Sequence, residues 1–415
     1  MPSGGPDDKT PAVALGPGAG ASASGDGLIR RRRRRWTCGG TVGMVGVLAG
    51  ALVAGWVVYT KLDGNITPDE AAAAELARYE RERPTALVRG AQNILLIGSD
   101  SRAGEGNGEY GRDTGTERSD TTILLHLSAG RGSATAVSIP RDLMVDVPGC
   151  RRPDGKRSTP MFAMFNYAFE TGGSACTIRT VEQMTDIRID HHVVVDFSGF
   201  KKLVDAVGGV RICVAEPIVD KEAKLRLPAG LVTLDGEQAL GYVRVRKSLG
   251  NGSDTDRMER QQQFLAALVQ KLRGNDVLLN PVKLYPVLDA ATSALTTDPG
   301  LASLRGLYDL VRGLRDIPTE RVQFLTVPRE SYAGNANRDQ LMEPAAERLF
   351  ERLRSDAPVQ VSGKTVLDFA GSAYEGNGGT VSESNGYGEY ADSVLSPASP
   401  APTFSGKTAV EDDCR

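Results

Sequence analysis

The chain has 415 residues, with 40% hydrophobic and 24% charged side chains and a formal net charge of −3. This length allows one large domain or two ordinary ones. The net charge excludes little, because the charges are distributed unevenly. There are only three histidines and no CxxC or Cys/His spacing, so nothing indicates a zinc site. GxSxG, P-loop, HExxH and Rossmann motifs are also absent from the sequence.

Residues 1–35 are predicted to be a disordered, basic segment on the cytoplasmic side. Residues 1–29 are rich in Gly, Ala, Ser and Pro and cannot bury a core, and six arginines, residues 30–35, follow them. Such a run could bind nucleic acid. Its place next to the apolar segment that follows favours a role in topology and in contact with lipid headgroups.

Residues 36–60 are predicted to be a transmembrane helix, because they contain no charge over 25 residues, which is enough to cross a bilayer. A buried core helix and a cleavable signal peptide are the alternatives. A signal peptide has a shorter apolar region, of roughly 7–15 residues. The positive-inside rule places the arginines in the cytoplasm and everything after Lys61 outside. We therefore expect a single-pass protein of the cell membrane with an extracytoplasmic folded part.

Residues 61–90 are helix-prone and are predicted to be a stalk, and residues 91–356 are predicted to be the folded domain. Apolar strand patterns occur at 93–98, 121–128, 134–140, 191–197, 210–216 and 322–328. Helical patterns occur at 177–187, 197–207, 257–272, 301–314 and 340–353. Strands that are apolar on both faces and alternate with helices indicate an α/β fold: a layered α/β/α domain with a central mixed sheet.

The last segment, residues 357–415, is rich in Gly, Ser, Asn, Pro and acidic residues and is predicted to be a disordered acidic tail. Three cysteines lie in the outside part before it. Cys150 and Cys176 flank one loop-and-helix segment, so in an oxidising compartment we expect them to pair. Cys213 stands in an apolar run and is expected to be a buried thiol.

The run VRVRKSLGNGSDTDRMERQQQ, residues 243–263, combines arginines with a Gly-rich loop. Arg244 and Arg246 are two apart and would share one face of a strand. Arg257 and Gln261 are four apart and would share one side of a helix. Guanidinium groups bind phosphate oxygens bidentately and stay charged at any working pH. This run is therefore predicted to hold a phosphate or pyrophosphate.

Arg/Asp pairs also stand at the ends of three predicted strands, namely Asp100 with Arg102, Arg118 with Asp120, and Arg141 with Asp142. Any one pair alone would be read as a surface salt bridge. Ligands gather at strand ends in open α/β sheets, so the pairs are expected to share one site. Mg²⁺ takes one or two carboxylates plus substrate phosphates, and Asp100 and Asp120 are the candidate ligands. A carboxylate there could also deprotonate an attacking hydroxyl. The three histidines are interpreted as packed or edge residues.

These stretches resemble the LytR–CpsA–Psr family of membrane-anchored cell-envelope phosphotransferases. The matching segments, in the family's order, are NILLIGSDSR, RSDTTILLHL, SIPRDLMVDVPG, FNYAFETGG, HHVVVDFSGFKKLVDAVGGV, LDGEQALGYVRVRK and DTDRMERQQQ. The resemblance implies a deep apolar lipid pocket and the transfer of a glycopolymer, with its proximal phosphate, from a polyprenyl-pyrophosphate carrier to peptidoglycan. A basic loop, residues 150–159, either contacts a polyanionic glycan or is simply solvated.

The resemblance also implies roles for single residues. Arg118, Arg141, Arg244 and Arg246 would hold the pyrophosphate, with Arg118 and Arg246 counted among the catalytic residues. Asp100 and Asp120 match carboxylates implicated in Mg²⁺ binding or base function. Asp254, Arg257 and Gln261 match a second cluster near the acceptor.

Other functions stay open at this point. A polyprenyl-pyrophosphate binding protein without catalysis would keep the arginines but not need the two carboxylates. A pyrophosphatase would use water in place of the sugar acceptor. A transcriptional attenuator is disfavoured, since no DNA-binding motif is visible and the folded part is expected outside the cell. The sequence does not name the glycopolymer.

Overall fold

The computed structural model describes residues 26–100, 119–221, 223–245, 254–273, 281–362 and 402–409. The chain divides into two compact units, Met1–Val58 and Tyr59–Arg415. Helix α1 (Asp26–Asn65) supplies the described part of the first unit, and its segment Met44–Asn65 is long and apolar enough to cross a membrane. Every side chain from residue 44 to residue 60 is exposed. An apolar helix without protein cover is what a membrane span requires.

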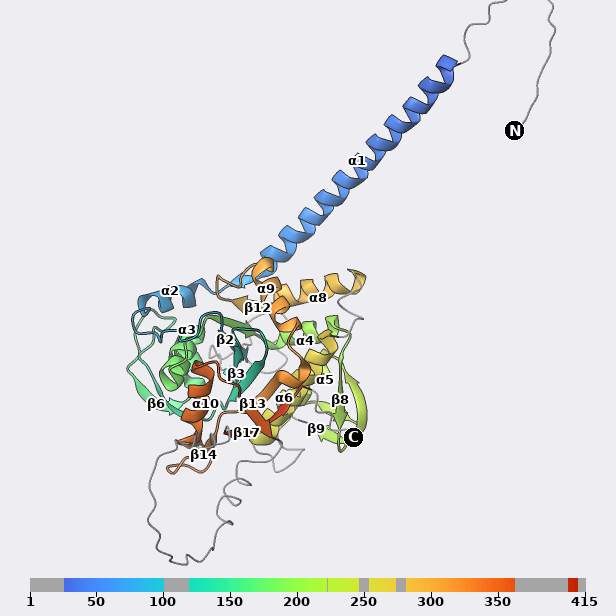
Figure 1. Cartoon of the computed structure of the whole chain (residues 1–415). Helices are drawn as coiled ribbons and strands as arrows, with labels where there is room; N and C mark the ends of the chain where they lie inside the picture. The colour runs from blue at the N-terminus through green and yellow to red at the C-terminus, as the bar shows by residue number, and fades with distance from the viewer. Residues whose placement is uncertain are drawn as a thin grey trace, which may run out of the picture. The chain divides into compact units, whose positions relative to one another are not determined.

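A nine-stranded mixed sheet forms the centre of the second unit, in the order β1-β12-β7-β2-β3-β4-β13-β17-β16 (Figure 1). Its strands are β1 (Thr67–Pro68), β12 (Leu295–Thr297), β7 (His191–Val195), β2 (Gln92–Ser99), β3 (Ser119–Leu127), β4 (Ala134–Ile139), β13 (Val322–Thr326), β17 (Thr403–Thr408) and β16 (Gln360–Ser362). The strand pair β2/β7 is parallel, whereas β2/β3 and β3/β4 are antiparallel. The predicted layered fold with a mixed sheet is confirmed.

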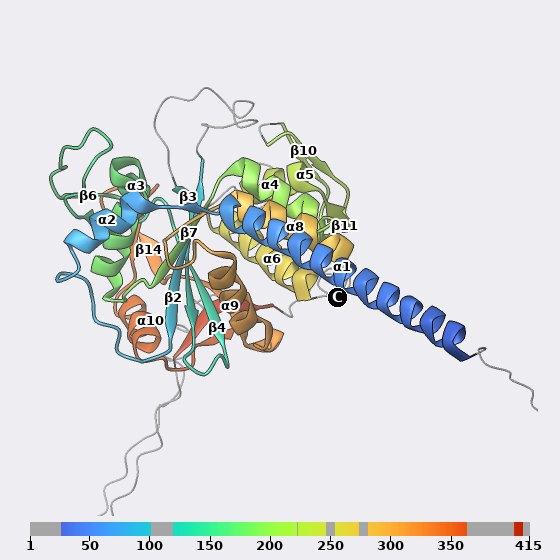
Figure 2. The same cartoon turned by 90° about the horizontal axis from the view of Figure 1, so that it is seen from above.

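Helices cover both faces of this sheet (Figure 2). On one face lie α2 (Glu70–Arg78), α3 (Asn166–Thr185) and α10 (Ala345–Arg354), which pack with Leu95 and Ile97 of β2. On the other face, α6 (Asp254–Arg273) and α9 (Leu304–Arg315) pack around Ile94 of the same strand. Successive side chains of a strand point to opposite faces, so the unbroken apolar pattern of β2 supplies both cores.

A third core lies beside the sheet. It is built from α4 (Phe197–Ala206), α5 (Gly236–Arg244), α8 (Pro281–Ala294) and the short strands β8 (Val210–Val214), β9 (Ile218–Asp220), β10 (Leu225–Leu227) and β11 (Gly230–Leu234). Phe264 of α6 packs into it and lies 5.4 Å, centroid to centroid, from Phe200 of α4. Helix α6 therefore joins this core to the central sheet. The remaining elements are β5 (Met144–Val147), β6 (Met161–Met164), β14 (Arg329–Ser331), β15 (Asp339–Leu341) and the 3₁₀ turn η2 (Thr319–Arg321).

The expectation of a helical stalk over residues 61–90 is wrong. Strand β1 adds to the edge of the sheet, and α2 buries Ala72 and Leu76 in the core. Arg83 donates to Glu182 of α3 at 2.8 Å and to the carbonyl of Ile189 at 2.6 Å. The helix-prone composition does give a helix, but its face with Ala72, Glu75 and Leu76 is buried in the domain, while Ala71, Ala74 and Ala77 are exposed.

The expectation that residues 357–415 are disordered throughout is also wrong. Strand β16 and strand β17 complete the sheet, and β17 pairs antiparallel with β13. Ala409, just after β17, is fully buried and donates its N–H to Val322. The segment TFSGKT has little apolar pattern, so its membership of the sheet depends on backbone pairing with β13.

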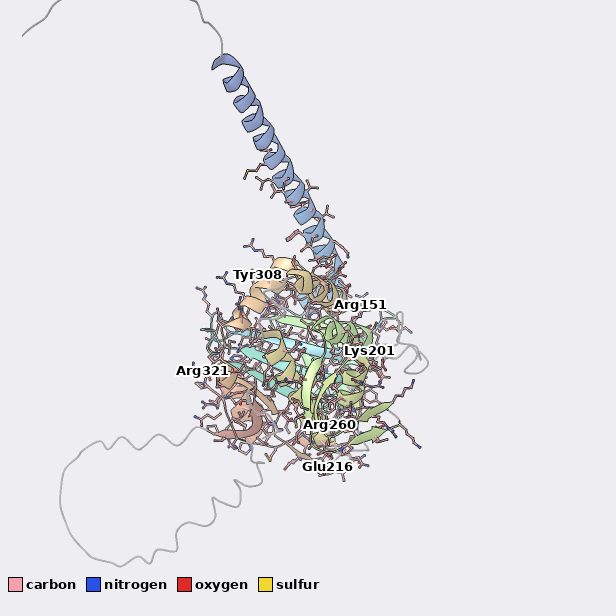
Figure 3. All side chains as sticks on the ribbon, turned by 90° about the vertical axis from the view of Figure 1, so that its right-hand side faces the viewer. Arg151, Lys201, Glu216, Arg260, Tyr308 and Arg321 are labelled. Carbon is pink, nitrogen blue, oxygen red and sulfur yellow. A yellow bond between two sulfur atoms is a disulfide. The ribbon has the colours of Figure 1, made fainter. Side chains whose placement is uncertain are left out.

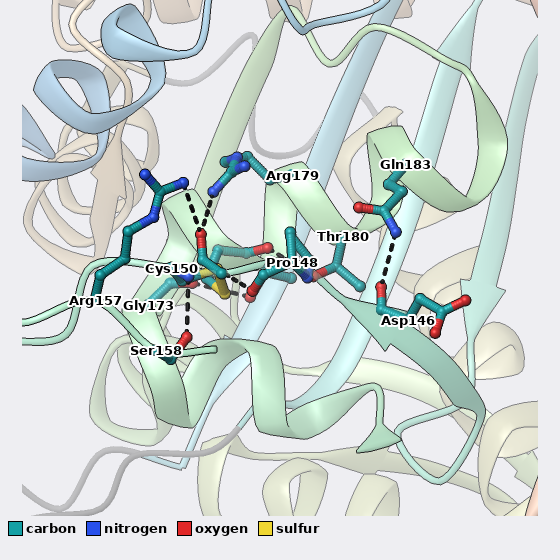
Figure 4. Close-up of a disulfide and its surroundings, with 12 residues drawn as sticks. Asp146, Pro148, Cys150, Arg157, Ser158, Gly173, Arg179, Thr180 and Gln183 are labelled. Atoms are coloured by element: carbon teal, nitrogen blue, oxygen red, sulfur yellow. Dashed lines mark hydrogen bonds between the residues drawn. A yellow bond between two sulfur atoms is a disulfide. The ribbon is translucent and has the colours of Figure 1, made fainter. Parts of the chain in front are cut away.

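The predicted disulfide between Cys150 and Cys176 is present and ties the loop after β5 to α3 (Figure 4). Arg179 of α3 donates to the Gly149 carbonyl at 2.7 Å, which fixes the same loop. A Cβ on Gly172 would lie 2.8 Å from the Arg151 carbonyl, so only glycine permits this approach. Cys213 is buried in strand β8 as expected, but the expectation that it is a thiol is wrong, because Cys213 is disulfide-bonded.

Candidate active site

A cavity of about 530 Å³ lies between the central sheet and the helices α4, α5 and α6. Its apolar lining is Leu96, Ile97, Ile123, Val193, Val195, Phe197, Phe200, Leu203, Ala223, Leu240, Val243, Phe264, Leu265, Leu268 and Leu295. A cavity with this lining would bind an apolar ligand through the hydrophobic effect, in proportion to the apolar surface that the ligand covers.

Charged and polar groups line the same cavity where three strands meet. Gly98 near the end of β2 pairs with Val195 at the end of β7 and with Thr121 near the start of β3, so these positions lie at one end of the sheet. The polar lining residues are Ser99, Asp120, Thr121, Asp196, Asp220, Arg244, Arg257 and Gln261. The cavity therefore joins an apolar interior to a charged group of side chains.

Asp120 is displayed by an irregularity in the sheet. Gly98 pairs with Thr121 while the next residue, Ser99, pairs with Ser119, so Asp120 is an extra residue in β3. Such a bulge re-aims a side chain and is common next to active sites. Arg141, just after β4, donates from Nη1 to Asp120 Oδ1 at 2.8 Å. The predicted meeting of the Arg118/Asp120 and Arg141/Asp142 loops is confirmed for Asp120 and Arg141.

Helix α5 brings Arg244 to the cavity, and this corrects one expectation. Arg244 is the last residue of a helix and not part of a strand. A capping box starts that helix, with Asp235 accepting from the Gln238 N–H and the Gln238 side chain accepting from the Asp235 N–H. The guanidinium of Arg244 lies 4.7 Å from the ring centroid of Phe197, the first residue of α4. This cation–π contact, together with the end of α5, fixes the cation at the cavity.

Helix α6 carries the other predicted residues, as the spacing of Arg257 and Gln261 indicated. Both line the cavity and both are buried. The Gln261 amide donates to Thr121 Oγ1 at 3.1 Å and to the Val243 carbonyl at 3.2 Å. Gln261 therefore connects α6 to β3 and α5. Arg260, one residue earlier, hydrogen-bonds to the Val245 carbonyl, and burial lowers its pKa.

Four predicted residues are less fully placed. Arg118 and Arg246 lie outside the described residues, so their roles stay predictions. Asp254 is the first residue of α6, and its side chain is likewise outside the description. Asp100 follows β2 directly and is half-buried, next to the cavity residue Ser99.

Sequence reasoning missed Asp196 and Asp220, which line the cavity. Asp196 ends the β7 segment and caps α4, accepting from the Gly199 N–H at 2.7 Å. An aspartate between an apolar strand and an amphipathic helix is a recognisable cap signal. Its position at a strand end indicated the site as well. No comparable signal marks Asp220.

The histidines are packed against carboxylates, as expected for structural residues. His126 is buried between Asn93 and Asp356, and His191 contacts Asp298 at 3.1 Å. Burial lowers the pKa of His126, whereas the hydrogen bond to Asp298 raises the pKa of His191. Asp69 accepts from Ser174 and from His192. None of the three histidines lines the apolar cavity.

Fold and site together define an α/β protein with a largely apolar cavity that charged side chains also line. The sequence model of the LytR_cpsA_psr family matches residues 62–355. The chain belongs to the LytR–CpsA–Psr family.

Curated relatives agree with this assignment. A probable cell wall biosynthesis protein, LcpB of Corynebacterium glutamicum, is 36% identical over 79% of this chain and 75% of its own length. The polyisoprenyl-teichoic acid–peptidoglycan teichoic acid transferase TagT of Bacillus subtilis is 30% identical over 66% of this chain and 86% of its own length. The crystal structure of B. subtilis TagV has the same fold, with a TM-score of 0.51, 24% identity and coverage of 65% of this chain and 98% of that one.

Proposed function

We propose that this protein transfers a glycopolymer, with its phosphate, from a polyprenyl-pyrophosphate carrier to peptidoglycan in the cell wall. The single observation that carries the proposal is a cavity with a wholly apolar interior and Asp120, Arg244 and Arg257 at the sheet end. A polyprenyl chain matches the first part, and a pyrophosphate matches the second. Relatives named for teichoic acid transfer to peptidoglycan support the same reaction.

The transfer exchanges one phosphorus–oxygen bond for another. The oxygen of an acceptor sugar hydroxyl bonds to the phosphorus nearest the glycan. The bond from that phosphorus to the bridging oxygen breaks, and polyprenyl phosphate leaves with the electron pair. The hydroxyl proton passes to a carboxylate, for which we propose Asp120, because it lines the cavity and is paired with Arg141.

Arginines stabilise the charge that collects on the phosphoryl oxygens during this exchange. Arg244 and Arg257 line the cavity, and Arg141 pairs with the carboxylate at its rim. Fixed cations that need no reorganisation during the reaction are effective in transition-state stabilisation. Arg118 and Arg246 are proposed to add to this set.

We propose that two carboxylates, Asp100 and Asp120, hold Mg²⁺. Among the described residues no cluster of three or more acidic, His or Cys side chains forms a closed metal cage. Mg²⁺ does not need one, because it is held by one or two carboxylates with substrate phosphates and water. Asp100 and Asp120 would supply those ligands, and the bound ion would neutralise phosphoryl charge.

The domain is proposed to work outside the cytoplasmic membrane. The arginine run at residues 30–35 precedes the apolar span and carries the positive charge that is retained on the cytoplasmic side. This orientation gives the domain access to lipid-linked glycan and to peptidoglycan.

Reconstitution of the full chain in nanodiscs tests the proposal. With a polyprenyl-pyrophosphate-linked glycan, peptidoglycan fragments and Mg²⁺, we expect release of polyprenyl phosphate and labelled peptidoglycan. Release of polyprenyl phosphate without labelled peptidoglycan would identify a pyrophosphatase. Donor binding without release would identify a lipid-binding protein. Chelation by EDTA, with restoration by added Mg²⁺, tests the metal.

A further inference from the structure

A second cavity, of about 850 Å³, adjoins the first. The two cavities share Ser99, Asp196 and Leu295 in their linings, so a ligand in one lies next to a ligand in the other. The second is bounded by α2, the middle of α3, β12 and the loop that follows Cys150. Its volume is in the range of pockets that hold small ligands.

The acidic side chains of this second cavity are already engaged within the protein. Asp69 accepts from Ser174, His192 and the Ala72 N–H. Glu75 pairs with Arg78 at 3.5 Å. Asp196 caps α4. These groups contribute little uncompensated negative charge.

Arg151 and Arg152, by contrast, are not engaged by acidic side chains of the described protein. Both line the second cavity and both are exposed; Figure 3 shows Arg151 at the surface of the domain. Within the described part of the chain, neither guanidinium has a hydrogen-bond or ion-pair partner. Two free planar cations beside a polar cavity are suited to carboxylate or phosphate oxygens.

The loop that carries these arginines is held in place. The Arg152 N–H donates to the Lys156 carbonyl at 2.8 Å, and Arg151 forms an isolated β-bridge with Arg157. The disulfide of Cys150 anchors its first end. Preorganisation of this kind lowers the entropic cost of ligand binding.

We infer that the second cavity binds an anionic saccharide and that Arg151 and Arg152 recognise its negative groups. This inference rests on the proposed transfer reaction, since the saccharide is a substrate at the adjoining centre. The negative groups are either the carboxylates of the peptidoglycan acceptor or the phosphates of the donor glycan. In both cases the saccharide extends from the reacting phosphorus into the second cavity.

The test compares the double variant Arg151→Gln/Arg152→Gln with Lys156→Gln, in the full chain in nanodiscs. Lys156 is an exposed cation of the same loop that does not line the cavity. Both arginines are exposed, so folding is expected to be intact, which melting temperatures verify. We measure kcat and KM with peptidoglycan fragments as acceptor, and with donors that carry either one phosphate-free disaccharide or several phosphate-bearing repeats.

An acceptor site predicts that the double variant raises the acceptor KM by about tenfold, with kcat nearly unchanged, as expected for the loss of two partly exposed ion pairs. A donor site predicts the same rise in KM for the phosphate-bearing donor only. Equal KM values for the double variant, Lys156→Gln and the wild type in both arms overturn the inference. If the wild type itself transfers nothing, the proposed function fails instead, and binding of the acceptor fragments by NMR still tests the cavity.

Discussion

Arg141 and Asp120 form an ion pair across 2.8 Å at the rim of the apolar cavity, although they are 21 residues apart. Asp120 lies at the start of β3, and Arg141 lies just after β4. The bulge in β3 turns Asp120 toward the cavity, and the end of β4 supplies its cation. The pair holds a carboxylate at the place where an apolar ligand meets charged groups.

Replacing the Asp120 carboxylate tests whether it contributes to the rate of transfer and not to the affinity for the donor. Asp120→Asn keeps the shape and can still accept from Arg141, but it removes the negative charge. We expect kcat for transfer to fall at least about 100-fold, in the range of general-base loss, while donor affinity measured without Mg²⁺ changes by less than about threefold. Single-turnover assays and donor titrations measure both. Asp309→Asn, at an exposed carboxylate of α9 that lines neither cavity, is the control. Undiminished turnover by Asp120→Asn would exclude it as the base.

A large side chain in the apolar cavity is expected to weaken the binding of donors with long lipid chains. Ala223 lines the cavity, so Ala223→Trp places an indole in the space for the polyprenyl chain. We expect KM to rise about tenfold or more for a long-chain donor and to change little for a short-chain analogue. Ala229→Trp, at an exposed position nearby, is the matched control. A similar rise for both donors would mean that the lipid lies elsewhere.

The sequence predicts that both faces of the central sheet are covered, but it does not predict the positions of several site residues. Unbroken apolar runs in β2, β3 and β4 predict a sheet covered on both faces, because each face needs its own apolar set. Arg244 was misassigned because the letters VRVR alternate like a strand. The capping box at Asp235 and Gln238 instead starts a helix that ends at Arg244. Four alternating residues are too few to predict a strand here, because the helix that contains Arg244 begins eight residues earlier.

Long-range pairing explains the other differences. Strand β17 pairs with β13 through backbone hydrogen bonds, which cannot be predicted from the pattern of side chains. The exposure of Asp120 depends on a one-residue shift between β2 and β3, and this appears only when the strands are paired. The Arg/Asp pairs in the sequence identified the correct strand ends, but the bulge decides which side chain faces the cavity.

The disulfide between Cys150 and Cys176 is expected to stabilise the domain. It closes a loop with a sequence separation of 26, for which the chain-entropy relation gives about 3.5 kcal/mol. Cys150→Ser/Cys176→Ser should lower the free energy of unfolding by about that amount and loosen the loop of Arg151. Denaturant unfolding followed by circular dichroism measures the change. Non-reducing peptide mapping should recover the linked peptides, and free thiols at both positions would contradict the pairing.

Acid stability reports on the network around Asp69. Burial alone would raise the pKa of this carboxyl, but hydrogen bonds from His192, Ser174 and the Ala72 N–H outweigh it and lower the pKa from 3.8 to about 2. A lowered folded-state pKa adds stability that is complete above about pH 4 and is lost as pH falls toward 2. The difference corresponds to about 2 kcal/mol.

Asp69→Asn tests this sign, because the amide cannot titrate. The variant should be less stable than the wild type at pH 7, and the two stabilities should converge between pH 4 and pH 2. Denaturant unfolding of both proteins at several pH values, followed by far-UV circular dichroism, measures the convergence. Asp309→Asn, at an exposed carboxylate of α9, should run parallel to the wild type throughout. A constant gap between Asp69→Asn and the wild type down to pH 2 would show that the Asp69 charge does not contribute through its pKa.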